Sequence, residues 1–319
     1  MKKLKRITLG LALAIGLSAC SSASSSDTEK KDILKIGIIQ IVDHPSLDAI
    51  RTNVIAQLEK DGYKDGDNIQ IDYQNAQGDQ ANLKTIASKL AKESDYIVAI
   101  ATPSAQAIAA ETSEIPTLFS GVTDPVDAGI VKTLKTPDTN FSGTTDAVDI
   151  EKQLSILTNI NPKTKTVGLI YNAAEANSKI QIDQAKAILK EKGIKTEEAT
   201  VASTNDIKQA MTSLTSKVDG IYVPSDNTLA SGMASVGEVA KEAKIPVIAA
   251  SSDQTLEGGL ATYGIDYSKL GVQTGKMLEK VIKKEVEISK LPVESAKDLE
   301  LTVNNDMAKA LGIETSSIK

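Results

Sequence analysis

The sequence predicts an α/β protein made of two doubly wound, parallel-sheet lobes. Short continuous apolar runs alternate with helical patterns along most of the chain, and such runs are typical of parallel strands that helices cover on both faces. The order of these segments also occurs twice, because Gln40 and Pro116 are 76 residues apart and Tyr171 and Pro246 are 75 apart. A repeat of this length indicates two similar domains. Two such lobes with facing strand ends enclose a cleft.

The stretch 95–124, DYIVAIATPSAQAIAAETSEIPTLFSGVTD, shows the repeated pattern clearly. It predicts a strand at 96–101, a helix at 104–111 and a strand at 116–121. Thr102 is the expected N-cap of the helix and Pro103 its first residue. Free backbone N–H groups therefore gather at the strand end where open α/β sheets bind ligands. Residues 219–253 repeat the order, with a second Pro-Ser turn and a second acidic loop.

Residues 1–19 have the features of a targeting segment. The start is basic, an apolar run covers 7–17, and Leu-Ser-Ala precedes Cys20, the only cysteine. The run is shorter than the roughly 20 residues that a membrane-spanning helix needs. Leu-Ser-Ala-Cys resembles the lipobox of bacterial lipoproteins, which implies cleavage before Cys20 and lipidation of that residue. A plain secretory signal is the alternative.

Residues 20–32 are rich in Ser and then in charge, which predicts a flexible tether. Loss of the signal removes four basic residues and changes the formal net charge from −6 to −10. An acidic chain with no basic stripe is not expected to bind nucleic acid. Because a single cysteine allows no intramolecular disulfide, the fold must depend on its core.

We expect the first lobe to comprise residues 33–142 and 264–285, and the second to comprise 143–263 and 286–319, with crossings near Phe141 and Tyr263. The strands are expected at 36–41, 68–73, 167–171, 196–201, 261–266 and 298–304. The helices are expected at 47–60, 82–92, 150–160, 205–216 and 267–283, and a further one ends at Lys192. His44, the only histidine, lies near Gln40 at the start of the first helix. Both are candidate ligand contacts, although a lone His at a helix start is more commonly a capping or surface residue.

Taken together, several strings resemble one family, the substrate-binding lipoproteins of ABC importers that include tryptophan- and tyrosine-type binders. They are IIQIVDHPSLDAIR, YQNAQGDQA, IVAIATPSAQAIA, GVTDPVDAG, YNAAEANS, IYVPSDNT and GIDYSKLGVQTGKM. The resemblance implies a type I periplasmic-binding-protein fold with three crossings and ligand capture by hinge closure. It also implies an ABC permease as partner, attachment to a Gram-positive cell surface through the lipid alone, a monomer and no cofactor.

A free amino acid, the ligand that this resemblance implies, needs an anion site, a cation site and a side-chain pocket. Helix starts and hydroxyls suit the carboxylate, acidic loop residues suit the ammonium group, and Tyr or Phe rings suit an aromatic side chain. Each acidic residue can instead cap a helix or a turn, and Phe119 can belong to the sheet core. The candidate set is Gln40, His44, Thr102, Ser104, Ala105, Ser120, Thr123, Asp124, Tyr171, Glu175, Asn177, Ser178, Asp226, Asn227, Asp253, Asp266 and Tyr267.

An enzyme is not expected. His44 is the only His and Cys20 the only Cys, which leaves no nucleophilic triad or zinc set, and no Gly-rich phosphate loop follows a strand. Paired carboxylates acting as a hydrolase are the remaining enzymatic option. Two binding alternatives stay open, namely a purine or nucleoside read by Asp226, Asn227 and Tyr171, and a ligand sensor that docks on a receptor instead of a permease.

Overall fold

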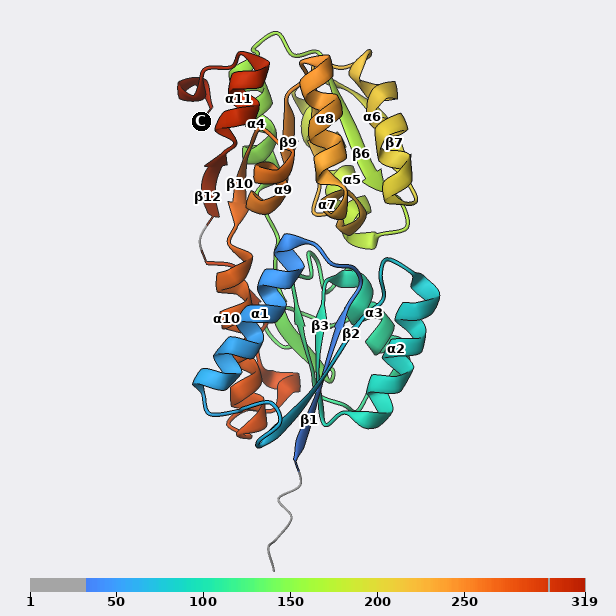
Figure 1. Ribbon diagram of the computed structural model, residues 1–319, viewed down its shortest axis with the longest axis vertical. Coiled ribbons are helices and arrows are strands. Elements are labelled where there is room, and N and C mark those ends of the chain that lie inside the picture. Colours follow the sequence, from blue (N-terminus) through green and yellow to red (C-terminus); the bar gives the residue numbers. More distant parts are fainter. Residues whose placement is uncertain (1–32, 298, 319) are drawn as a thin grey trace, which may run out of the picture. The chain divides into compact units, whose positions relative to one another are not determined.

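The structure, a computed structural model, describes residues 33–297 and 299–318, so the expectations for the signal, Cys20 and the tether lie outside it. The described chain contains two six-stranded sheets (Figure 1). In spatial order the first is β11 (Glu294–Ser295), β5 (Phe141–Thr145), β4 (Thr117–Ser120), β3 (Tyr96–Ile100), β1 (Leu34–Gln40) and β2 (Ile69–Asn75). The second is β12 (Leu299–Val303), β10 (Ala261–Ile265), β9 (Val247–Ala249), β8 (Gly220–Val223), β6 (Thr166–Asn172) and β7 (Lys195–Val201).

The two sheets share one topology. All neighbours are parallel except β10 and β12, which are antiparallel. When the strands of each half are numbered from its first strand, both sheets have the spatial order fifth, fourth, third, first and second. One additional strand from the C-terminal part of the chain, β11 or β12, lies beside the fifth strand at the edge of each sheet. The repeat expected from the sequence and the α/β fold class are therefore confirmed.

Helices cover both faces of the first sheet (Figure 1). On one face, α1 (Pro45–Lys60) packs against α10 (Tyr267–Ile282), and on the other, α2 (Gln80–Glu93) packs against α3 (Thr102–Glu111). A short helix η2 (Ile288–Lys290) follows α10. The central strands are fully buried, as in the run from Ile36 to Gln40, because side chains on both of their faces pack under helices.

The second sheet is covered in the same way. On one face lie α4 (Ile150–Ile160) and α5 (Ala176–Glu191), and on the other lie α6 (Ile207–Thr215) and α8 (Met233–Ala243). Short helices α7 (Asn227–Ser231) and α9 (Ser252–Glu257) follow β8 and β9 at their carboxyl ends. The remaining helices are η1 (Thr204–Asp206), α11 (Asn305–Leu311) and η3 (Thr315–Ser317). Each sheet has its own apolar core.

The lobes exchange one helix each. The helix α4 follows β5 of the first sheet but packs on β9 and β10 of the second, while α10 follows β10 but packs on β4 and β5. The chain passes between the sheets after β5, after β10 and after β11. These are the three crossings that the family resemblance implied. They place Asp146 directly after β5 and Tyr267 just after β10.

One boundary differs from the sequence expectation. Residues 286–296 were expected in the second lobe, but β11 pairs with β5 of the first sheet, and Leu291 and Val293 pack into the first core. The apolar side chains in this segment need a core to bury them, and the first lobe provides it. The strands β5 and β10 also stay in their own sheets to Thr145 and Ile265, so the crossings come a few residues later than expected.

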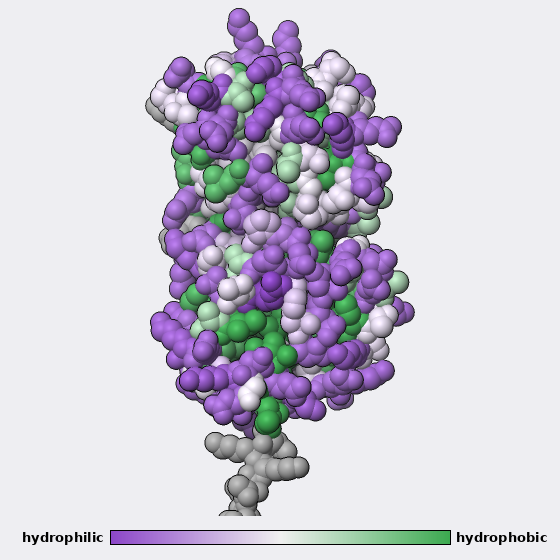
Figure 2. Space-filling view, in the orientation of Figure 1, coloured by the Kyte–Doolittle hydropathy of each residue, from purple (hydrophilic) through white to green (hydrophobic). Residues whose placement is uncertain are grey.

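The face of the molecule drawn in Figure 2 is mostly hydrophilic, with hydrophobic side chains in small separate groups. Among the described residues, the large hydrophobic side chains with the greatest exposure are Leu256, Ile33 and Leu134. Scattered residues of this kind are ordinary on a soluble surface and do not mark an interaction site.

Candidate functional site

A small cavity lies where the carboxyl ends of the two sheets' strands meet. It has a volume of about 20 Å³, which is room for about one water molecule. Its lining includes seven of the residues expected from the sequence, namely His44, Thr102, Thr123, Asn177, Asp226, Asn227 and Tyr267. Both lobes contribute to it, and so do residues at two of the crossings.

The first lobe presents the start of α3 to this cavity. The helix begins at Thr102 and its N-cap is Ala101, one residue earlier than expected, because Ala101 takes φ 72° and ψ 161° while Thr102 is already helical. Such a conformation is strained for a residue with a Cβ atom and is often found at functional sites. The side-chain oxygens of Thr102 and Ser104 are buried without a hydrogen-bond partner, and the first-turn N–H groups have no partner inside the helix. This edge suits an anion.

His44 faces the second lobe from the end of the loop before α1. It is the N-cap residue of α1, but its side chain makes no capping bond. The ring atom Nε2 lies 3.4 Å from Oδ1 of Asn227, and Nδ1 is buried without a partner. Burial lowers the pKa of His44, and this effect outweighs the opposite effects of Asn227 and Glu175. A neutral imidazole at the cavity is therefore expected at neutral pH.

The second lobe presents two buried carboxylates at the start of α7. Asp226 accepts hydrogen bonds from the backbone N–H of Asn172 at 2.6 Å, from Ser178 Oγ at 2.7 Å and from the N–H of Leu229 at 2.8 Å. Burial raises the pKa of Asp226 to about 7, and the neighbouring Glu175 contributes to this rise.

Glu175 supports the same turn from behind. Its carboxylate accepts hydrogen bonds from the N–H of Asn227 at 3.0 Å and of Thr228 at 3.1 Å, and from the side-chain amide of Asn177 at 3.2 Å. Glu175 does not line the cavity itself. Its role in the structure is to order the turn that carries Asp226 and Asn227.

A third buried carboxylate lies at the first crossing. Asp146 accepts hydrogen bonds from the Tyr267 hydroxyl at 2.7 Å and from Thr123 Oγ1 at 3.0 Å. Burial raises the pKa of Asp146, whereas the two hydroxyl donors lower it. Burial and the nearby Asp146 raise the pKa of Tyr267, so its phenol keeps its proton and acts as the donor. This pair joins the first and second crossings at the wall of the cavity.

None of these three carboxylates has a basic partner. Within the described part of the chain, no ion pair involves Asp146, Glu175 or Asp226, although all three side chains are buried. Burying a carboxylate without a counter-ion is costly. The arrangement therefore favours a cation in the cavity, beside Asp146 and Asp226.

Other candidates from the first lobe lie beside the cavity and do not line it. Gln40 is buried and donates from Nε2 to the carbonyl of Val42 and to Asp48. Ser120 is hydrogen-bonded to Thr144 and Thr274 in the core, while Ala105 is packed inside α3. Asp124 accepts bonds from the N–H groups of residues 126 and 127 and so closes its own turn.

Four further candidates lie apart from the cavity wall or support it from behind. Tyr171 points along the surface of the second sheet and donates to Glu198 at 3.0 Å, because its position in β6 faces away from the cavity. Asp266 is the N-cap of α10, and Ser178 supports Asp226. Asp253 accepts a hydrogen bond from Ser46 at 2.8 Å. Phe119, considered for a ring wall, is fully buried in the core.

Sequence reasoning missed the other residues of the lining. They are Ser46, Leu47, Ala101, Gly121, Asp146, Ser225, Ala230, Ser251 and Gln254. Ser225 and Ser251 sit in the two loops of the second lobe already singled out, so these loops could have indicated them. Small residues such as Ala230 carry no chemical signal of their own. Asp146 was not among the candidates, and its position depends on contacts with the distant residues Tyr267 and Thr123.

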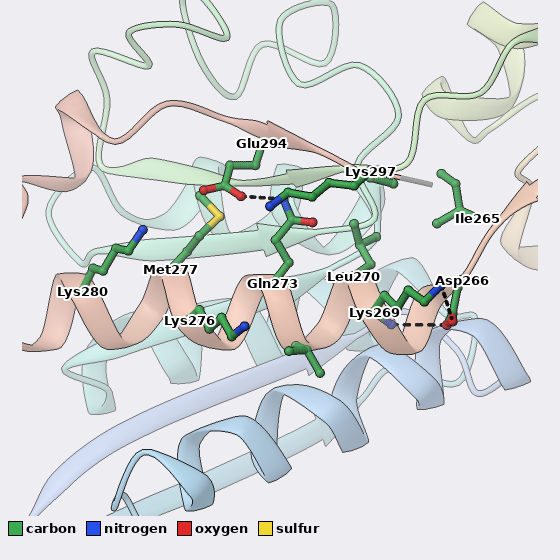
Figure 3. A pocket seen from close by; sticks show the side chains of 12 residues that line it. Ile265, Asp266, Lys269, Leu270, Gln273, Lys276, Met277, Lys280, Glu294 and Lys297 are labelled. Atoms are coloured by element: carbon green, nitrogen blue, oxygen red, sulfur yellow. Dashed lines mark hydrogen bonds and ion pairs between the residues drawn. The ribbon is translucent and has the colours of Figure 1, made fainter. Parts of the chain in front are cut away.

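A second cavity, of about 300 Å³, lies along α10 beside β11 (Figure 3). Its lining includes Lys276, Lys280 and Lys297, and Gln273 is hydrogen-bonded to Glu294. Among the buried polar atoms without a partner in the described residues, none belongs to this lining. Its lining also contains no residue of the loops that follow β6, β8 and β9 in the second lobe. The smaller cavity is therefore the candidate functional site.

The described residues contain neither an arranged metal-binding cluster nor a membrane-spanning helix. No group of three or more His, Cys, Asp or Glu is arranged there to hold a metal ion. No helix of residues 33–297 or 299–318 is both long enough and apolar enough to cross a membrane.

The fold and this cavity define a two-lobed protein of the type I periplasmic-binding-protein class. Residues 35–318 match the family described as ABC transporter substrate binding protein, and the chain belongs to that family. It is 40% identical over 314 residues to a tyrosine-binding protein from Clostridioides difficile, over 97% of this chain and 91% of that one.

Two solved structures add to this comparison. The first is an ABC domain in complex with L-Trp from Streptococcus pneumonia, with 38% identity, a TM-score of 0.83, and coverage of 88% of this chain and 95% of that one. The second is the ligand-free, open structure of a substrate-binding protein with adhesive properties from Clostridium difficile. It is 48% identical, has a TM-score of 0.67, and covers 88% of this chain and 96% of that one.

Proposed function

We propose that this chain is the extracytoplasmic, lipid-anchored substrate-binding component of an ABC importer, and that it captures an aromatic amino acid between its lobes for a permease. The observation that carries the proposal is that one edge of the cavity suits an anion and the opposite edge suits a cation. The unpartnered Thr102 hydroxyl at the start of α3 faces it from the first lobe, and Asp226 faces it from the second, with Asp146 at the crossing. A zwitterion matches both edges.

The polar groups assign a role to each edge. The ligand carboxylate would lie at the start of α3, within reach of the Thr102 hydroxyl and the free N–H groups. The ligand ammonium would lie between Asp146 and Asp226, whose carboxylates retain free acceptor positions. The Tyr267 ring and the side chain of Leu47, both in the lining, offer apolar surface to an aromatic side chain.

The relatives support the ligand class and a moving hinge. One is a tyrosine-binding protein and another was solved with L-Trp. The open, ligand-free relative is more identical in sequence than the L-Trp complex, at 48% against 38%, yet its TM-score is lower, at 0.67 against 0.83. A rotation of the lobes accounts for this inversion. A cavity of about 20 Å³ is also far below the roughly 300 Å³ of typical ligand pockets, so a ligand needs the lobes to separate first.

The alternatives have less support from the structure. A purine would be read by Asp226, Asn227 and Tyr171. Asp226 lines the cavity, but the side chain of Asn227 bonds to Glu175 and faces His44, and Tyr171 bonds to Glu198. A hydrolase built on paired carboxylates is disfavoured because the family match is to substrate-binding proteins. We therefore propose a monomeric binding protein and not an enzyme. The permease is favoured over a receptor because the family match is to ABC transporter substrate-binding proteins.

Isothermal titration tests this function with four compounds, namely tryptophan, tyrosine, the des-amino analogue of tryptophan, and adenosine. Tryptophan and tyrosine are expected to bind. The des-amino analogue should bind at least about 100-fold more weakly, because it leaves buried carboxylates unpaired. If adenosine binds and neither amino acid does, the amino-acid assignment is wrong.

A further inference from the structure

A hydrogen bond joins the two lobes directly, away from the crossings. Ser46 Oγ donates to Asp253 Oδ2 at 2.8 Å, although the residues are 207 positions apart. Ser46 lies in the first turn of α1 and Asp253 in the first turn of α9. These helices belong to different lobes, so this bond exists only while the lobes are together. The ring of His44 and the side chain of Asn227 approach each other across the same boundary.

Asp253 is placed to hold the lobes and not the ligand. It does not line the cavity, whereas Ser46 does. Among the described residues it has no ion pair with Lys or Arg. Its carboxylate therefore has the Ser46 hydroxyl as its partner across the lobes. A hydrogen bond to a carboxylate acceptor is stronger than one between neutral groups.

We propose that the Ser46–Asp253 hydrogen bond is a latch that keeps the lobes together and slows ligand release, with Asp253 acting without contact with the ligand. The proposal rests on the proposed binding function. A group that acts only on closure affects every ligand equally, since it changes the equilibrium between open and closed forms and not the fit of the ligand. Its effect should appear in the dissociation rate, because the bond must break and the lobes must separate before the ligand can leave.

The chain offers a matched control. Ser252 precedes Asp253 in α9, and its hydroxyl bonds to Thr302 Oγ1 at 2.8 Å within the second lobe. The variant Ser252→Ala therefore removes a hydrogen bond from the same helix without affecting the contact between lobes. The conservative variant Asp253→Asn keeps an acceptor oxygen for Ser46, so it should restore part of what Asp253→Ala loses.

The test measures affinity, dissociation rate and solution size. Asp253→Ala is expected to weaken tryptophan and tyrosine binding by about tenfold each, which is about 1.4 kcal/mol, with their ratio unchanged and the dissociation rate increased. Ser252→Ala should bind like the wild type. The double variant Ser46→Ala/Asp253→Ala should bind no more weakly than the weaker single variant, because both changes remove the same bond.

Small-angle scattering without ligand decides the latch separately from the ligand assignment. The radius of gyration of Asp253→Ala should exceed that of the wild type, while Ser252→Ala should match the wild type. If the wild type binds neither amino acid, the proposed function fails, and this comparison still tests the latch. Equal radii for Asp253→Ala and the wild type would overturn the latch. A change in the tryptophan-to-tyrosine affinity ratio would also overturn it, because that result means direct ligand contact.

Discussion

At the scale of single residues, the main feature of the site is buried negative charge. Asp226 and Glu175 are neighbouring buried carboxylates. Asp226 accepts hydrogen bonds from two backbone N–H groups and from the Ser178 hydroxyl. Donors stabilise the ionised form, whereas burial and the charge of Glu175 oppose it. Burial and Glu175 outweigh the hydrogen-bond donors, because the pKa of Asp226 is raised to about 7. A ligand ammonium beside Asp226 would shift this balance back.

This balance predicts proton release when the ligand binds. With its pKa at about 7, free Asp226 is protonated at pH 6, and an ammonium group favours the ionised form. Titration of tryptophan at pH 6 in buffers of different ionisation enthalpy should therefore show a net release of protons, and the affinity should fall as the pH falls from about 7 to 5. Burial lowers the pKa of His44, which opposes protonation of its ring as the pH falls.

The free protein should show the opposite trend in stability. The folded state holds a proton on Asp226 that the unfolded state loses above about pH 4, so the free energy of unfolding should decrease as the pH rises from about 4 to 7. The des-amino analogue of tryptophan is the control and should release no protons. Identical heats for tryptophan in all buffers would contradict the role of Asp226 as a receptor for the ammonium group.

The residue types at strand ends were the most predictable part of the site. Thr102 and Asp226 follow buried strands directly, and the general rule for α/β sheets places them at the cleft. Tyr171 and Asp253 also lie near strand ends, but neither lines the cavity. The direction of a side chain depends on the alternation of the strand and on the residues packed opposite it, such as Glu198 for Tyr171 and Ser46 for Asp253. Asp146 gains its place from Tyr267, 121 residues later. Such contacts are tertiary and leave no local signal.

At the scale of elements, β5 packs closely against β4 just before the first crossing. Gly143 in β5 has φ 155°, and a Cβ atom there would lie 1.9 Å from the backbone oxygen of Phe119. Backbone atoms of a central strand cannot move aside as a side-chain tip can. Glycine is therefore required at this position, and it allows β5 to carry Asp146 to the cavity wall.

The variant Gly143→Ala should accordingly lower the free energy of unfolding by about 3 kcal/mol or more, since it overpacks the backbone of two paired strands. Urea denaturation measures this loss. Gly129→Ala is the matched control, because Gly129 has φ 74° and a Cβ atom added there would have no neighbour within 4 Å. The control should cost only the conformational strain, about 1 kcal/mol. Similar losses in both variants would contradict the steric argument.

At the scale of the whole molecule, the duplicated order of elements made the fold predictable. Spacings of 76 and 75 residues in the sequence correspond to two sheets with the same strand order. The local pattern could not show which sheet receives a short segment after the last long helix. β11 has only two residues, so its assignment depends on the apolar contacts of Leu291 and Val293 with the first core.

The attachment of the whole protein to a membrane is proposed from its first 20 residues, outside the part that the structure describes. An apolar run ends at Leu-Ser-Ala-Cys, and Cys20 precedes the first described residue, Ile33, by 13 positions. If Cys20 is the anchor, its removal should release the protein from the membrane without changing its stability or its ligand affinity. Each buried CH₂ of an attached acyl chain contributes about 0.8 kcal/mol to membrane binding, so loss of the lipid should release the protein almost completely.

We therefore expect Cys20→Ala to abolish lipid attachment, as measured by mass spectrometry of the N-terminal peptide. A variant with a plain secretory signal in place of residues 1–20 should appear in the soluble fraction with unchanged tryptophan affinity and unfolding temperature. Ser21→Ala is the control and should stay with the membrane, because the hydroxyl beside Cys20 carries no lipid. If the protein with the plain signal remains in the membrane fraction after a high-salt wash, then another part of the chain binds the membrane, and Cys20 is not its sole anchor.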